Sequence, residues 1–438
     1  MLNRALVVIL FFLTFAFVRA DEDEFNTEQL PIGNPKTKYD FCLVKLDKIF
    51  DTNSNIDIAL DQLIQNLKKY RIIMLGESHT SEPNHKLQLE IIKGLTESGS
   101  SMCLALEMFN PSQDQVLEDF IQGKLTEEEF LDQSTYFNTW GYNYRYYKPI
   151  FDYAREKKIK MFGVNIERDY ASKIGRDGIG SLSPEERKNL PPLDTTNVEH
   201  RFYFKVAMEG MDATSPVQFS RLYDAQCLWD AAMGDGAIKV ARENPKSIIA
   251  MLVGSGHVAY NLGIGKIIKE RSEFPFASVI AVDVPDTIQE SVMMKVKKDL
   301  KGEKKEVKAD STMEMEMPSM SVIHGGAMET SPYQIVIRSL ADFLVGVPEE
   351  EQEKYPTFGF SIEEKEGNGF KVKMVFPESL AEEKGLQRGD IILAIDGKTF
   401  SDMAQLKKHL NNKNWGDDID FKILRDDKEM NLNFKIEK

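Results

Sequence analysis

The residues best suited to chemistry in this chain belong to two Gly-x-x-His segments, at residues 76–79 and 254–257, and each follows an apolar run. A third apolar run, residues 102–109, carries a carboxylate, Glu107, near its far end. Burying an unpaired carboxylate is costly, so Glu107 needs a partner. We therefore treat four side chains as candidate catalytic residues: Glu77, His79, Glu107 and His257.

Two imidazoles and a carboxylate form a set that a divalent first-row metal ion accepts, with coordination positions left for water. The expected metal ligands are His79, His257 and Glu107. Such a site lowers the pKa of bound water and polarises a carbonyl group. Without a metal, a His–Glu pair can act as general base and orienting group in hydrolysis. The plainer alternative is that these polar groups only tie strand ends together by hydrogen bonds.

Five strand-like runs are expected to position these side chains. They are residues 72–75, 102–109, 160–165, 247–253 and 277–284. Helical patterns alternate with them, at 56–69, 83–97 and 221–232. Residues 175–215 are rich in Gly, Pro and charged residues at first and then helical, which indicates an inserted helical subdomain. This alternation predicts an α/β fold, with a mainly parallel sheet flanked by helices. Ligands gather where the strands of such sheets end, and both Gly-x-x-His segments lie at such ends.

An aromatic stretch lies between the second and third of these strands. Its rings are Phe137, Trp140, Tyr142, Tyr144, Tyr146 and Tyr147. One interpretation is a wall of core aromatics. The other is a surface that lines a haem, with Tyr147 near the iron, because a phenolate oxygen is a known haem ligand. The candidate cofactor-binding residues are Tyr147 and His79, with His85 as a weaker candidate. We assign His200, His324 and His409 to the surface or to loops.

The N-terminus has the features of an export signal. Residues 1–20 combine an early arginine, a long apolar run and a Val-Arg-Ala ending before acidic residues. This predicts a cleaved signal peptide rather than a retained anchor, and hence a periplasmic or secreted protein without a transmembrane segment in its mature chain. Residues 21–44 form an acidic lead-in, expected to be disordered over 21–40.

The composition excludes some partners. A formal net charge of −15 argues against binding to nucleic acid or to anionic membranes. Three cysteines allow at most one disulfide, so the chain is not a disulfide scaffold. Residues 295–331 form a charged, Met-rich insertion. Its thioethers and His324 suit Cu(I), and the alternative is a mobile insertion that binds no metal.

After a charged linker at residues 348–354 the sequence pattern changes to short strands and turns. Residues 355–438 resemble a PDZ domain, a small and partly open β-barrel, because every element of that domain occurs in order. The resemblance implies that the amides of Phe358, Gly359 and Phe360 take a terminal carboxylate. It also implies that a helix near Met403 walls a groove for C-terminal peptides, which add as a strand to the sheet edge.

The larger part of the chain, residues 45–345, resembles the ChaN-like haem-binding proteins of the Tiki superfamily, and we place the domain at 45–347. The matching motifs are Leu-Gly-Glu-Ser-His at 75–79 with His85 and Gln88, Leu-Glu-Met-Phe at 106–109 with Gln113, Trp-Gly at 140–141 with Tyr-Lys-Pro-Ile at 147–150, and Gly-Ser-Gly-His at 254–257. The resemblance implies haem or iron handling at the cell envelope, as in iron uptake. For Tiki-type members it implies metal-dependent proteolysis through the two Gly-x-x-His units and the glutamate.

Three functions follow from these observations. The first is an exported haem- or iron-binding protein with a PDZ domain. The second is a metal-dependent hydrolase or protease whose PDZ domain recruits peptide substrates. The third is a non-enzymatic envelope scaffold that acts through its PDZ domain. The cofactor is accordingly haem or a divalent first-row metal ion, and the chain is a possible homo-oligomer.

Overall fold

A computed structural model describes residues 26–208, 215–285, 306–309, 313–316, 332–364 and 369–437. The expected signal peptide, His324 and most of the Met-rich insertion lie outside these ranges. The chain divides into two compact units. The first unit contains residues 1–79, 83–124 and 150–349, and the second contains residues 80–82, 125–149 and 350–438. Each unit is described by itself.

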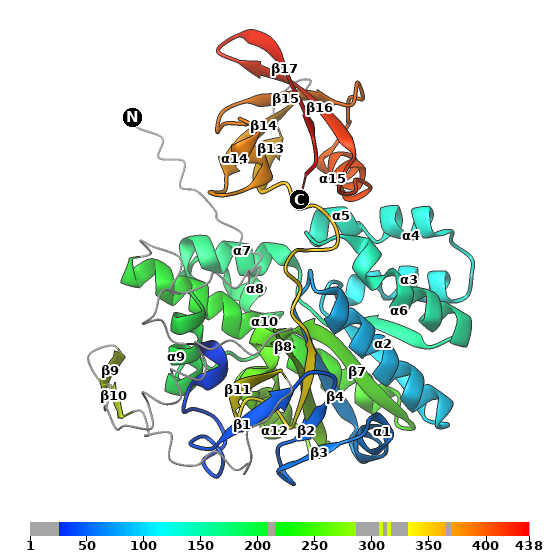
Figure 1. The fold of residues 1–438 in the computed structure, drawn as a ribbon, viewed down its shortest axis with the longest axis vertical. Helices are drawn as coiled ribbons and strands as arrows, with labels where there is room; N and C mark the ends of the chain where they lie inside the picture. Colours follow the sequence, from blue (N-terminus) through cyan, green and yellow to red (C-terminus); the bar gives the residue numbers. More distant parts are fainter. Residues whose placement is uncertain are drawn as a thin grey trace. The chain divides into compact units, whose positions relative to one another are not determined.

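An eight-stranded sheet forms the centre of the first unit (Figure 1). Its strands, in order across the sheet, are β3 (Ile56–Ile58), β2 (Ile49–Asp51), β12 (Phe343–Pro348), β8 (Phe276–Val284), β4 (Ile72–Glu77), β7 (Ser247–Gly254), β5 (Ser101–Leu106) and β6 (Lys160–Gly163). The strands from β12 to β6 pair in parallel, and β2 and β3 pair antiparallel. The predicted mainly parallel sheet is therefore confirmed.

Every residue of the central strands β4 and β7 is buried, which shows that both faces of the sheet are covered. Helix α1 (Leu60–Leu67) approaches α2 (Glu82–Glu97) closely, since a Cβ on Gly94 would lie 2.7 Å from Ile64 Cδ1. Helix α10 (Pro216–Glu243) packs as tightly on α12 (Ile264–Arg271), where a Cβ on Gly234 would lie 2.5 Å from Ile267 Cγ2. Close helix packing of this kind fixes the strand ends from both sides.

The helical subdomain occupies the connection between β6 and β7. It contains α7 (Arg168–Asp177), the 3-10 turn η3 (Ile179–Ser181), α8 (Pro184–Lys188), α9 (Val198–Ala207) and α10. The helix expected over 56–69 is shorter than predicted. Residues 56–58 form β3 instead, because they pair with β2 before α1 begins at Leu60.

The N-terminal lead-in is ordered where the structure describes it, so the expectation of disorder over 21–40 is wrong for residues 26–40. Leu30 and Ile32 are buried. The Tyr260 hydroxyl accepts a hydrogen bond from the Leu30 amide at 3.0 Å and donates to the Thr27 carbonyl at 2.7 Å. Strand β1 (Phe41–Lys45) then pairs with β11 (Tyr333–Ile337). The burial of Leu30 and Ile32, together with these hydrogen bonds, keeps the segment ordered despite its acidic composition.

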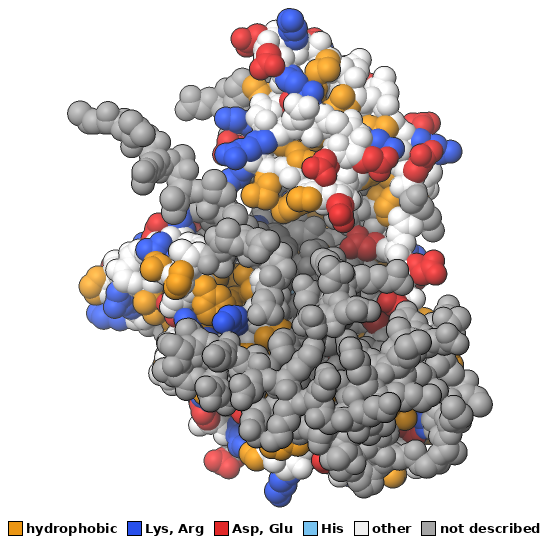
Figure 2. All heavy atoms as spheres, turned by 60° about the vertical axis from the view of Figure 1, so that its left-hand side comes forward, with side chains coloured by type: hydrophobic (Ala, Val, Ile, Leu, Met, Phe, Trp, Pro, Cys, Tyr) orange, Lys and Arg blue, Asp and Glu red, His pale blue; other side chains and the backbone are white. Residues whose placement is uncertain are grey.

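The cysteines form no disulfide. Cys42, Cys103 and Cys227 are all free and buried. Among the described residues, no helix is both long enough and apolar enough to cross a membrane. On the face shown in Figure 2, acidic and basic side chains are mixed with hydrophobic ones over the described surface.

A five-stranded antiparallel sheet forms the core of the second unit. Its order is β13 (Phe360–Glu364), β14 (Phe370–Val375), β15 (Ile391–Ile395), β16 (Asp418–Arg425) and β17 (Lys428–Lys435). Two helices, α14 (Leu380–Glu383) and α15 (Met403–Asn411), complete it. This confirms the small β domain expected after the linker.

Residues 125–149 belong to this second unit although they lie far from it in sequence. They contain α4 (Glu127–Gln133), α5 (Tyr136–Thr139) and the start of α6 (Tyr144–Lys157). The Arg145 guanidinium lies 3.9 Å from the centre of the Tyr355 ring and donates to the Lys413 carbonyl at 2.6 Å. Asn143 Nδ2 donates to the Asn411 carbonyl at 2.9 Å. These contacts fix the segment on the C-terminal end of α15.

We predict that Gly163→Ala destabilises the first unit by about 1–3 kcal/mol. A Cβ at this end of β6 would lie 2.4 Å from the Asn110 carbonyl oxygen, and backbone cannot move aside as a side chain can. Urea unfolding of the full chain measures the change. Gly180→Ala is the matched control, because nothing lies within 4 Å of its Cβ position. Equal stability of the two variants would contradict this packing.

Candidate functional site

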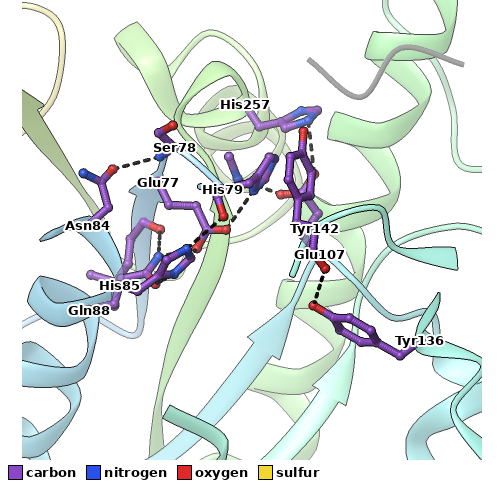
Figure 3. Close-up of polar contacts among 12 residues, drawn as sticks. Glu77, Ser78, His79, Asn84, His85, Gln88, Glu107, Tyr136, Tyr142 and His257 are labelled. Atoms are coloured by element: carbon purple, nitrogen blue, oxygen red, sulfur yellow. Dashed lines mark hydrogen bonds and ion pairs between the residues drawn. The ribbon is translucent and has the colours of Figure 1, made fainter. Parts of the chain in front are cut away.

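The candidate site lies at the carboxyl edge of three adjacent strands. Strands β4 and β7 pair so that Glu77 lies beside Gly254. Strand β5 lies on the other side of β7, and the Glu107 amide continues this pairing by donating to the Leu252 carbonyl at 3.2 Å. The side chains of Glu77, His79, Glu107 and His257 gather at this edge (Figure 3). The structure therefore brings together the four side chains grouped from sequence.

Glu77 orients the first histidine. It is the last residue of β4 and is 3% exposed. Its Oε1 lies 2.8 Å from His79 Nδ1. A carboxylate only accepts hydrogen bonds, so Nδ1 carries the proton and the lone pair of the ring is on Nε2.

Three polar groups from α2 hold this arrangement in turn. Gln88 Nε2 donates to Glu77 Oε2 at 2.7 Å and to the Leu75 carbonyl at 3.0 Å. His85 lies behind the carboxylate, with Nδ1 3.6 Å from Glu77 Oε2 and Nε2 3.2 Å from the His79 carbonyl. Asn84 Oδ1 accepts from the Ser78 amide at 2.8 Å. His85 is 3% exposed, so it supports Glu77 and His79 from inside.

Glu107 is tied to the second Gly-x-x-His segment. Its Oε2 accepts from the Gly254 amide at 2.7 Å, and its Oε1 lies 3.5 Å from His257 Nε2. A Cβ on Gly254 would lie 3.1 Å from His79 Nε2 and 3.6 Å from Glu107 Oε2. The absent side chain thus lets the first imidazole and the glutamate approach the same point.

His257 has two partners on α10 that the sequence interpretation missed. Its Nδ1 lies 2.6 Å from Asp230 Oδ1 and 2.9 Å from Gln226 Nε2. Burial opposes the charged ring, but Asp230 and then Glu107 favour it, and together they raise the pKa of His257 above its ordinary value. The signal in the sequence was the i, i+4 spacing of Gln226 and Asp230 on one helix face.

His200 is not a surface or loop residue as expected from the sequence, and that assignment is wrong. It lies on α9 and is 4% exposed, with Nε2 3.4 Å from Asp230 Oδ2. Its Nδ1 lies 3.3 Å from the Tyr223 hydroxyl. Burial outweighs the attraction of Asp230 and lowers the pKa of His200. His409, in the second unit, is partly buried beside Asp396.

The aromatic stretch is packed as a core. Its six rings, Phe137, Trp140, Tyr142, Tyr144, Tyr146 and Tyr147, are all at most 6% exposed. Tyr147 is 0% exposed and its ring contacts Trp140 edge-on, with centroids 6.4 Å apart. A fully buried phenol is poorly placed to bind an iron atom, so the burial favours the core interpretation of these rings over the haem-lining one.

His79 and His257 are the residues at this edge that could hold a cofactor. Among the residues the structure describes, no group of three or more His, Cys, Asp and Glu side chains is arranged to hold a metal ion. Haem iron needs only one or two protein ligands, and imidazole is a common one. Ligating histidines usually donate their other ring nitrogen to a carboxylate, as His79 and His257 do here. Their side chains are also 13% and 12% exposed, which leaves them accessible.

The expected carboxylate-binding loop lies in the second unit. Gly359 has φ +72°, and a Cβ there would lie 2.2 Å from Ser379 Cβ, so only glycine fits. The carbonyls of Phe358 and Gly359 accept from the amides of Ala381 and Phe376. Within the described sheet β13, which begins at Phe360, is an edge strand and is available for strand addition. Met403, at the start of α15, packs against the same core.

Comparisons with known proteins agree with this division. A family model described as "Haem-binding uptake, Tiki superfamily, ChaN" matches residues 63–268, and a PDZ domain model matches residues 356–436. A curated chloroplastic protein of Arabidopsis thaliana, RETICULATA-RELATED 5, is 26% identical over 135 residues. That match covers 29% of this chain and 18% of the relative, so the chain spans under a fifth of the relative's length.

Three solved structures are also similar. ChaN of Campylobacter jejuni with cofacially bound haem is 18% identical, covering 55% of this chain and 92% of that chain, with a TM-score of 0.45. An erythromycin esterase, EreC, is 13% identical, covering 70% of this chain and 97% of that chain, with a TM-score of 0.38. The HtrA-type protease AlgW with a decapeptide is 23% identical, covering 19% of this chain and 29% of that chain, with a TM-score of 0.18.

The raised pKa of His257 predicts a pH-dependent contribution to stability. A folded-state pKa above the unfolded value, about 6.5, stabilises the fold below that value and loses its effect as pH rises through the folded pKa. The stability difference between the wild type and His257→Gln should therefore be largest below pH about 6.5 and shrink as the pH rises through the folded-state pKa. Urea unfolding at several pH values measures it.

His200→Gln is the matched control for this series. Its pKa is lowered in the folded state, so its contribution is lost as pH falls, and the slope with pH has the opposite sign. Two variants with the same slope would show that the assigned charge partners are wrong.

Proposed function

We propose that the chain binds haem through His79 and His257 and captures peptide C-termini. The match of residues 63–268 to the family model described as "Haem-binding uptake, Tiki superfamily, ChaN" and of residues 356–436 to a PDZ domain model supports this proposal. One observation carries the haem proposal. Two imidazoles lie at neighbouring strand ends, and each has Nδ1 held by a buried carboxylate. A proton fixed on Nδ1 leaves Nε2 as the ligating nitrogen.

Bound haem would supply an iron that accepts nitrogen ligands, and His79 and His257 would hold it. The chain's own residues prepare for this. Glu77 and Asp230 fix the ring orientations, and Glu107 holds the Gly254 turn close to His79. As iron-binding residues this proposal keeps His79, adds His257 and drops Tyr147, because the two histidines are partly exposed and the phenol is not. Export through residues 1–20, and with it a role in iron uptake outside the cytoplasm, forms part of the same proposal.

We predict that His79→Ala and His257→Ala each raise the apparent Kd for haem by at least about tenfold, because each removes a nitrogen ligand to the iron. Titration of the full-length protein with haem, followed by the Soret band, measures this. Tyr147→Phe is the control and should leave the band position and the affinity unchanged. Wild-type behaviour of both histidine variants, or no Soret band for the wild type, would remove the haem proposal.

A second candidate function is hydrolysis, favoured by the Glu77–His79 pair. A buried carboxylate that fixes Nδ1–H leaves Nε2 as a general base. The same two histidine variants test it with ester and peptide substrates. Hydrolysis that resists chelators and is lost in His79→Ala is what this candidate requires.

The peptide-binding part of the proposal depends on the loop at 358–360 and on the open edge of β13. The groove side of the domain carries partly buried apolar groups, among them Phe360, Ile362 and Met403. Peptides that end in an apolar residue with a free carboxylate fit such a surface, since the main chain adds to the sheet and the side chain enters the groove.

We predict that Gly359→Ala abolishes binding of such peptides. The new Cβ would collide with Ser379 and shift the loop that takes the carboxylate. Fluorescence anisotropy with labelled short peptides, in free-acid and amidated forms, measures the affinity. Gly397→Ala is the matched control: its φ of +71° gives a similar backbone strain, but nothing lies within 4 Å of its Cβ position. Equal binding of free-acid and amidated peptides would contradict carboxylate capture.

A further inference from the structure

Asp230 bridges two histidines in the interior of the first unit. It lies on α10 and is 2% exposed. One oxygen, Oδ1, lies 2.6 Å from His257 Nδ1, and the other, Oδ2, lies 3.4 Å from His200 Nε2. A buried carboxylate is costly unless its surroundings compensate for it, so this placement needs an explanation.

The backbone makes room for this carboxylate. A Cβ on Gly263 would lie 2.9 Å from Asp230 Cγ and 2.8 Å from the His257 carbonyl oxygen. Both distances are shorter than real Cβ contacts. Glycine at position 263 therefore leaves the space in which Asp230 reaches the imidazole, and the turn after His257 is built around the pair.

Gln226 lies beside the same ring nitrogen. Its Nε2 lies 2.9 Å from His257 Nδ1, while its Oε1 is buried and makes no hydrogen bond. An amide nitrogen only donates, so Asp230 Oδ1, at 2.6 Å, is the acceptor for a proton on Nδ1.

His200 lies on the other side of Asp230. The Tyr223 hydroxyl donates to the Asn197 carbonyl at 3.1 Å, so it accepts from His200 Nδ1, which lies 3.3 Å away. In the neutral ring Nε2 then carries no proton, and it faces Asp230 Oδ2 at 3.4 Å without a hydrogen bond. The hydrogen-bonded oxygen of Asp230 is therefore Oδ1, which faces His257.

We propose that Asp230 is a positioning residue that fixes the proton of His257 on Nδ1 and so directs Nε2 of that ring toward Glu107 and the ligand. Gly263 leaves the space for this contact. The inference deepens the proposed haem function, since it names what prepares the second imidazole. It concerns the ligand-free protein and so is testable apart from haem binding.

The first test needs no variant. In protein labelled with nitrogen-15 at histidine, long-range proton–nitrogen correlation spectra separate protonated from unprotonated ring nitrogens. The His257→Ala spectrum identifies the His257 signals. We expect the wild-type Nδ1 to be protonated, with Nε2 unprotonated in the fraction of neutral rings. A neutral ring protonated on Nε2 would overturn the proposal, whatever the protein binds.

The second test uses Asp230→Asn. An asparagine can turn its NH₂ toward Nδ1, which moves the ring proton to Nε2 and blocks ligation there. We expect the tautomer to change and the haem Kd to rise about 10- to 100-fold, the range for loss of a supporting carboxylate. Asp235→Asn is the matched control, because Asp235 lies on the same helix but pairs with Arg271.

The outcomes separate this proposal from the haem proposal. A changed tautomer in Asp230→Asn with no haem binding by the wild type supports the positioning role and removes the haem function. An unchanged tautomer in a folded Asp230→Asn overturns the positioning role. Should that variant fail to fold, Gly263→Ala, which crowds Asp230 from the opposite side, is expected to weaken the Nδ1 signature, and an unaltered signature would count against the proposal.

Discussion

The parallel pairing of β4 with β7 is the constraint on which the candidate site depends. This register places Glu77 beside Gly254, so both Gly-x-x-His segments emerge from the same edge of the sheet. A shift of one residue would turn the side chains of one strand to the opposite face. Such a shift would also move Glu77 away from Gly254. The register thus fixes the relative positions of these polar groups.

Beyond this register, the site is organised by buried carboxylates. Glu77 and Asp230 each hold the Nδ1 of one histidine, and Glu107 holds the backbone of the Gly254 turn. Each carboxylate has compensating neighbours, such as the Gln88 amide at Glu77. The two histidines follow different strands, but in both a carboxylate holds Nδ1 and leaves Nε2 for a ligand.

The sequence was sufficient for the fold class and for the strand ends, because apolar runs and glycine positions are local signals. It was sufficient for the PDZ domain too, where every element occurs in order. It was not sufficient for Asp230 and His200, since a polar residue inside a long helix has many possible partners and only tertiary packing selects one. The same limit applies to Leu30 and Ile32, which lie in an acidic segment but are buried by β1, β11 and Tyr260. Tyr147 shows the reverse error: its residue type suits iron, but its burial does not.

The chain passes between its two compact units at five points, after residues 79, 82, 124, 149 and 349. The second unit is therefore connected to the first at several points of the chain and not through one linker. Deleting everything after residue 349 would leave Arg145 without Tyr355 and Lys413, and Asn143 without Asn411. Expressing 356–436 alone would strip the end of α15 of the same contacts. The residues matched by the PDZ domain model, 356–436, are therefore only part of the compact unit that contains them.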